Sequence, residues 1–179
     1  MPDEPLRVRL AQIQKQWDDK GPESLRVDEF LALAEQGARD RPKDPGPHLA
    51  IGTIMEMAGR TDEAMMAYQS ALRRAPDEVE AIRRLADLRF KSTQQVDPVT
   101  AALYREWYKK DPTQLRAGYL AGIGTWLEGD KPEAEKIWAD VESRSPPPET
   151  RSMYLALRQM YGIDPAPSPA TPPAQQPPG

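Results

Sequence analysis

The sequence contains no cysteine and only one histidine, His48, among its 179 residues. The absence of cysteine excludes disulfides, cysteine-ligated zinc, thiol catalysis and covalent attachment of haem to this chain. A single histidine without cysteine holds a transition metal only together with carboxylates. His48 opens an expected helix, where packing is its expected role. We therefore predict no metal site and no cofactor.

No set of residues with catalytic spacing is present either. The segment Gly122-Ile-Gly124 resembles a dinucleotide-binding loop, but it lacks the third glycine and falls within an expected helix. The carboxylates stand at expected helix starts or beside Lys and Arg, as on a solvated surface. The sequence predicts a protein that is not an enzyme and has no catalytic residues.

Long apolar runs and runs of basic residues are also missing. No stretch is long enough to span a membrane, and residues 1–20 carry Asp, Glu and Arg where a signal peptide needs an apolar segment. The 24 basic and 28 acidic residues are interleaved and give a net charge of −4, which does not favour binding to nucleic acid. We expect a soluble chain with no export signal of its own, which could belong to a larger anchored protein.

A pattern of small, aromatic and helix-ending residues repeats at an offset of 70 positions. Gly52, Gly59, Ala64, Tyr68, Ala71 and Pro76 correspond to Gly122, Gly129, Ala134, Trp138, Val141 and Pro146. This interval is two units of about 34 residues with two residues to spare. Ala86, Tyr104 and Pro112 take the equivalent positions of a middle unit, which places the two extra residues in a turn within 91–98.

These spacings resemble the tetratricopeptide repeat (TPR) family, in which each unit is a pair of antiparallel helices. The small residues Gly52, Ala86 and Gly122 stand where the two helices of a pair approach closely. Gly59 and Gly129 suit helix C-caps with positive φ, and Asp97 and Asp130 suit N-caps. The fold class implied is all-α, a TPR-type solenoid of antiparallel helix pairs.

We expect one helical-repeat domain over residues 1–162 and a disordered, proline-rich tail over 163–179. Apolar stripes within 6–17 and 27–38 predict a helical hairpin ahead of the first full unit. In order, the expected parts are this leading hairpin (5–42), repeat 1 (45–78), repeat 2 with a lengthened inner turn (79–114), repeat 3 (115–148) and a capping helix (149–162).

In the TPR family the first helices of the pairs line a concave surface that binds most ligands. The family pattern, carried over to this sequence, assigns a peptide-binding groove to Leu49, Thr53, Glu56, Met57, Arg83, Arg84, Asp87, Phe90, Arg116, Tyr119, Ile123 and Trp126. Leu49 and Thr53 replace the Lys and Asn of the relatives that clamp a terminal carboxylate. The remaining apolar and arginine-bearing set favours an amphipathic helix or extended peptide with apolar anchors and acidic residues. The alternative is that Phe90, Tyr119 or Trp126 packs against a neighbouring helix.

A narrower resemblance is to the TPR domain of the bacterial cytochrome c maturation factors that chaperone apocytochrome. It covers residues 26–42, 45–76, 79–112 and 115–146, and includes Gly129-Asp130 and Trp138. The resemblance implies a periplasmic domain that holds apocytochrome c, commonly by its C-terminal helix, alongside other cytochrome c maturation components. It also implies a membrane anchor in a parent protein. The alternative is a general adaptor, periplasmic or cytoplasmic, that joins folded proteins in a complex.

Overall fold

The computed structural model describes residues 8, 15 and 27–163, and all secondary structure between 27 and 163 is helical. The helices are α2 (Val27–Asp40), α3 (Gly46–Met57), α4 (Thr61–Arg74), α5 (Val79–Thr93), α6 (Pro98–Lys110), α7 (Leu115–Leu127), α8 (Lys131–Ser143) and α9 (Pro148–Met160). The first helix of the predicted leading hairpin and residues 164–179 of the predicted tail lie outside this description.

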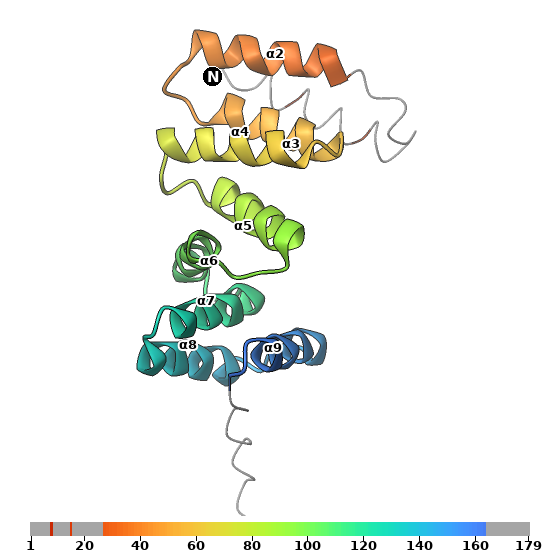
Figure 1. Cartoon of the computed structure of the whole chain (residues 1–179). Helices are drawn as coiled ribbons and strands as arrows, with labels where there is room; N and C mark the ends of the chain where they lie inside the picture. The colour runs from red at the N-terminus through yellow and green to blue at the C-terminus, as the bar shows by residue number, and fades with distance from the viewer. Residues whose placement is uncertain (1–7, 9–14, 16–26, 164–179) are drawn as a thin grey trace, which may run out of the picture.

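The helices stack one after another along a single direction (Figure 1). From α2 to α8, each helix packs against its neighbours along the chain, whereas the main contact of α9 is with α7. The pairs α3–α4, α5–α6 and α7–α8 therefore follow each other as antiparallel hairpins with α9 at the end. The predicted all-α, TPR-like solenoid is confirmed.

Within two of the pairs, a glycine of the first helix lies directly under an aromatic ring of the second. A Cβ atom built on Gly52 would lie 2.5 Å from the Tyr68 ring, and one built on Gly122 would overlap the Trp138 indole. Both aromatic side chains are buried. The close approach predicted from these small residues is therefore present, and it is what lets a large ring fit between two helices of one pair.

Three of the helices end in the same glycine motif. Gly59, Gly129 and Gly162 have φ values of 71°, 96° and 63°, and the residue after each donates its N–H to a carbonyl five residues back, as in a Schellman motif. At the N-termini of α6 and α8, the Asp97 side chain accepts from the Thr100 N–H at 2.9 Å and the Asp130 side chain accepts from the Glu133 N–H at 3.2 Å. The predicted C-caps at Gly59 and Gly129 and both predicted N-caps are confirmed.

The last motif corrects the predicted start of the tail. Ile163 was assigned to the disordered segment, but its N–H bonds to Arg158 O at 2.8 Å and its side chain is buried in the core. The reason is the hydrophobic contact that accompanies a Schellman motif, since the residue after the αL glycine turns back onto its own helix.

The second pair differs from the other two around its inner connection. Helix α5 has 15 residues, against 12 in α3 and 13 in α7. It ends at Thr93, its C-cap residue Gln94 takes a left-handed conformation with φ 54°, and residues 94–97 lead into α6. The connections after α3 and α7 are residues 58–60 and 128–130. The extra residues therefore lengthen both the first helix and its turn.

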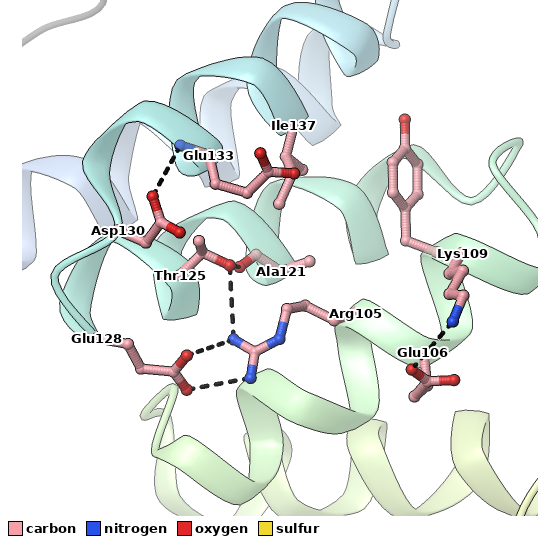
Figure 2. A pocket seen from close by; sticks show the side chains of 10 residues that line it. Arg105, Glu106, Lys109, Ala121, Thr125, Glu128, Asp130, Glu133 and Ile137 are labelled. Atoms are coloured by element: carbon pink, nitrogen blue, oxygen red, sulfur yellow. Dashed lines mark hydrogen bonds and ion pairs between the residues drawn. The ribbon is translucent and has the colours of Figure 1, made fainter.

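A pocket of about 550 Å³ opens between the second helices α6 and α8, with α7 as its floor (Figure 2). Its lining consists of Arg105, Glu106, Tyr108, Lys109, Ala121, Thr125, Glu128, Asp130, Glu133 and Ile137.

In the part of the chain that the structure describes, no helix is long and apolar enough to cross a membrane.

Substituting Gly52 with alanine tests the close approach. The added methyl would meet the Tyr68 ring, and overpacking of this kind costs about 1–3 kcal/mol, which exceeds the gain in helix propensity of about 1 kcal/mol. We expect Gly52→Ala to lower the free energy of unfolding in urea. Gly37→Ala in α2 is the control, because its nearest contact would be an ordinary 3.4 Å. Equal stability of the two variants would show that the approach is not tight.

Candidate polypeptide-binding surface

Nine of the twelve predicted groove residues keep part of their side chain in solvent. They are Leu49, Thr53, Glu56 and Met57 on α3, Arg83, Arg84 and Asp87 on α5, and Arg116 and Trp126 on α7. All belong to the first helices of three consecutive pairs. Together they form a surface that mixes apolar side chains with arginines and carboxylates, which we call the first-helix surface.

The other three predicted groove residues are buried, so their assignment to a ligand surface is wrong. Phe90 is 8% exposed, and Tyr119 and Ile123 are each 0% exposed. Tyr119 stacks on Tyr154 of α9 with ring centroids 4.0 Å apart, and Phe90 meets the edge of Tyr104 at 6.4 Å. For Tyr119 the physical reason is that α9 packs on α7 and places Tyr154 on the tyrosine ring. Phe90 is instead covered by Tyr104 of α6 and by the Arg116 guanidinium of α7.

Trp126 is intermediate between these two groups. Its ring stacks on Trp138 with centroids 5.6 Å apart, and the ammonium group of Lys131 lies 4.9 Å above it. A tryptophan held in this way keeps one fixed orientation, and its remaining exposed part can serve as a rigid contact for a ligand.

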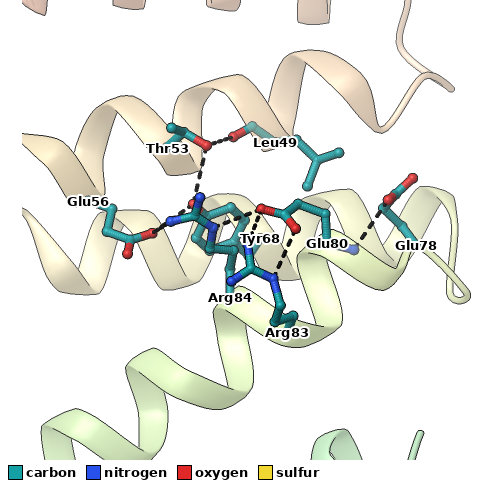
Figure 3. A network of polar contacts seen from close by, with 8 residues as sticks. All are labelled: Leu49, Thr53, Glu56, Tyr68, Glu78, Glu80, Arg83 and Arg84. Atoms are coloured by element: carbon teal, nitrogen blue, oxygen red, sulfur yellow. Dashed lines mark hydrogen bonds and ion pairs between the residues drawn. The ribbon is translucent and has the colours of Figure 1, made fainter. Parts of the chain in front are cut away.

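A carboxylate joins the first pair of helices to the second (Figure 3). The Glu56 side chain on α3 accepts a hydrogen bond from the Tyr68 hydroxyl at 3.0 Å and another from Arg84 of α5 at 3.1 Å. Arg84 also donates to Glu80 at 2.8 Å, and Arg83 binds Glu80 with a shorter contact of 2.6 Å. Tyrosine, carboxylate and arginine thus form one connected cluster across the junction.

The same arrangement recurs at the second junction. The Asp87 carboxylate accepts from the Tyr104 hydroxyl at 3.0 Å and from Arg116 of α7 at 2.7 Å. The Arg116 guanidinium also lies 5.8 Å from the centroid of the Phe90 ring. Helix α7 is therefore fastened to the preceding pair by a charge-assisted bond and a cation–π contact.

At the third junction, between the pair α7–α8 and helix α9, the same kinds of residue interact, but they stand at different positions of the repeat. Trp138 stands where the earlier pairs have tyrosine, and its indole N–H donates to the Tyr119 carbonyl. The hydroxyl comes instead from Tyr119, which donates to Glu142 of α8 at 2.8 Å. Arg151 of α9 forms an ion pair with Glu142 at 3.2 Å. Each junction thus has a tyrosine, a carboxylate and an arginine, and the arginine comes from the helix that follows the pair.

The electrostatics of these clusters fix the direction of the hydrogen bonds. Burial raises the pKa of all three tyrosine hydroxyls, and the carboxylate beside each raises it further. The hydroxyls therefore remain protonated at neutral pH and act as donors. Burial alone would raise the pKa of Glu80 as well, but hydrogen bonds from Arg83 and Arg84 outweigh it and lower that pKa.

The predicted groove arginines are all engaged within the protein. Arg83 and Arg84 bind Glu80, Arg84 also binds Glu56, and Arg116 binds Asp87. Their charge is balanced by carboxylates of this chain, so an acidic ligand would meet arginines that already have partners. Sequence reasoning missed Tyr68 and Tyr104 as members of the surface network. The signal available was their recurrence in two units, each with a carboxylate on the first helix.

Nothing in the described residues assembles a metal or redox centre. Groups of three or more His, Asp or Glu side chains with the geometry of a metal site are absent from residues 27–163. His48 is half-buried at the start of α3, and burial together with Arg73 and Arg74 lowers its pKa.

Comparisons with known proteins agree with this architecture. Residues 45–88 match the family model of the tetratricopeptide repeat, and no curated protein matches the sequence significantly. The crystal structure of MamA is similar, with a TM-score of 0.55 and 16% sequence identity over 86% of this chain and 83% of that chain. At that identity the likeness shows a shared solenoid fold.

A double-mutant cycle tests the bridge at the second junction. We expect Tyr104→Phe to lower the free energy of unfolding by about 1 kcal/mol, since the hydroxyl loses its bond to Asp87. In an Asp87→Ala background the same substitution should cost less, because its acceptor is already gone. Urea unfolding of the four proteins, followed by circular dichroism, measures the coupling. A cost that is identical in both backgrounds would rule the bridge out as a stabilising element.

Proposed function

We propose that this chain is a non-catalytic protein-interaction module that binds a polypeptide segment along α3, α5 and α7. The observation that carries the proposal is that the first helices of three consecutive pairs keep partly exposed apolar and charged side chains and are joined to one another by the contacts Glu56–Arg84 and Asp87–Arg116. Leu49, Glu56, Arg83 and Arg84 lie together where α3 meets α5 (Figure 3). Stacked helix pairs typically use such extended surfaces to bind other chains.

The contacts of this surface favour a particular kind of ligand. Leu49 and Met57 on α3 and the exposed part of Trp126 on α7 offer apolar contacts. The arginines between them are paired, but a guanidinium has five N–H donors, so a ligand carboxylate can add to the existing pairs. We therefore propose an amphipathic segment whose apolar side chains supply the affinity and whose acidic side chains set its register.

The finer proposal is that the client is apocytochrome c, held by its C-terminal helix in the periplasm by a part of a membrane-anchored protein. Its support is the sequence resemblance over residues 26–42, 45–76, 79–112 and 115–146. An amphipathic helix with acidic positions is also the class of ligand that the first-helix surface favours. Affinity near the micromolar range is expected, since ordering a flexible peptide offsets much of the contact energy.

Calorimetric titration of a peptide with the sequence of an apocytochrome c C-terminal helix tests both levels of the proposal. Met57→Glu should weaken binding about tenfold or more, because it places a charge where an apolar side chain would pack. Met66→Glu is the matched control: Met66 belongs to the second helix of the same pair, is 60% exposed, and should leave binding unchanged.

Two further peptides separate the outcomes. A scrambled peptide of equal composition should not bind, because its apolar residues no longer share one face. An unrelated amphipathic helix that binds as tightly as the apocytochrome peptide would refute the apocytochrome client and leave polypeptide binding intact. Failure of every peptide to bind would refute the module itself and favour an adaptor for folded partners.

A further inference from the structure

We propose that the pocket between α6, α7 and α8 is a second recognition site, which accepts a lysine or arginine side chain of a polypeptide partner. It lies between the second helices α6 and α8 over α7, and none of its lining residues belongs to the first-helix surface. The inference therefore goes beyond the proposed function and does not depend on it.

The floor of the pocket is apolar because α7 presents small side chains there. Ala121 is 1% exposed and Thr125 is 5% exposed, and the Thr125 hydroxyl donates to the Ala121 carbonyl at 2.9 Å. Half-buried Ile137 of α8 and Tyr108 of α6 form apolar parts of the walls. Its volume falls within the range of about 300–1,000 Å³ that is usual for ligand sites. An aliphatic stem would pack well against such a floor.

The basic side chains on the α6 wall are already paired with carboxylates of this chain. Arg105 binds Glu128 through two hydrogen bonds of 2.8 and 3.2 Å, and Lys109 lies 3.9 Å from Glu106 (Figure 2). A guanidinium that is already bound in this bidentate way is a poor site for a ligand carboxylate. The α6 side therefore does not favour an acidic ligand.

The α8 wall carries an excess of negative charge. The lining as a whole has four carboxylates and two basic side chains. Asp130 and Glu133 lie on the α8 side, where Asp130 accepts from the Glu133 N–H. The partner of the Glu133 carboxylate is Lys136, whose side chain is 75% exposed and outside the lining. The Lys136 ion pair is exposed and contributes little, so the two carboxylates stay accessible to an incoming cation, while the apolar floor supplies most of the contact.

These features together specify the occupant. The stem of a lysine or arginine lies on Ala121 and Ile137, and its charged end meets Asp130 and Glu133. A bound metal ion does not fit, because no three carboxylates of residues 27–163 converge as a metal site would require. A polypeptide is the source of the side chain, since a pocket of about 550 Å³ also has room for the residues beside it.

Amide chemical shifts in a nitrogen-15 labelled sample measure the binding directly. The probe is a blocked pentapeptide with a central arginine between alanines, and its glutamate counterpart is the control. We expect the arginine peptide to shift the amides of Thr125, Glu128, Asp130, Glu133 and Ile137, and the glutamate peptide to leave them in place. Added salt should weaken the effect, because the charges are near solvent.

A charge-removing double variant gives the decisive comparison. Asp130→Asn with Glu133→Gln keeps the N-cap oxygen but removes both charges, and it should weaken arginine-peptide binding about fivefold or more. Asp62→Asn with Glu63→Gln, at the matching turn of α4, should leave binding unchanged. The proposal is overturned if the pocket variant binds as tightly as the wild type, if the shifts map elsewhere, or if no shifts occur. Met57→Glu should not affect these shifts, so the two sites fail or succeed separately.

Discussion

The stack depends on a hydrogen bond from a buried tyrosine hydroxyl to a carboxylate at the junction between two helix pairs. In a solenoid each pair contacts only its neighbours, so the junctions have to supply the stability that a globular core would supply elsewhere. Tyr68 and Tyr104 are fully buried, and an unpaired buried hydroxyl costs about 1–3 kcal/mol. Glu56 and Asp87 accept these hydroxyls and bind an arginine of the next pair with the same carboxylate. One carboxylate thereby satisfies a core hydroxyl and holds the following helix in register.

This arrangement constrains how the surface can bind anything. The arginines that would attract an acidic ligand already hold the stack together, so a ligand that pulled them away would weaken the junction it docks on. Ligand carboxylates therefore have to add to the pairs, and most of the affinity must come from apolar contacts around them. Because the paired charges are already fixed in place, little side-chain entropy is lost when a ligand meets them. The clusters therefore help to fix the register in which a segment binds and add little to its affinity.

Sequence reasoning succeeded where the deciding interactions lie within one hairpin. The helix ends at Gly59 and Gly129 and the glycine–aromatic contact at Gly52 follow from spacing, because caps and close approaches leave a mark within a few residues or at a fixed offset. The burial of Tyr119 and Ile123 could not be derived in this way. For Tyr119 it depends on α9 folding back onto α7 and on Tyr154 stacking on its ring, and these are contacts between elements whose relative placement no local pattern records. The pairing of Arg116 with Asp87 could not be predicted from the sequence for the same reason, since the two residues belong to different repeat units.

Helix α7 contributes to both of the proposed binding surfaces. Nine of its 13 residues are buried, and its apolar side chains face all directions, as in a helix enclosed by its neighbours. One side contributes Arg116 and Trp126 to the first-helix surface, and another contributes Ala121 and Thr125 to the floor of the pocket. Gly118 and Gly122 let Tyr108 and Trp138 approach it from α6 and α8. These contacts pack α7 closely between α6 and α8. The two surfaces are therefore expected to act as independent sites on a shared rigid element, so that one partner that reached both would gain affinity through its linkage alone.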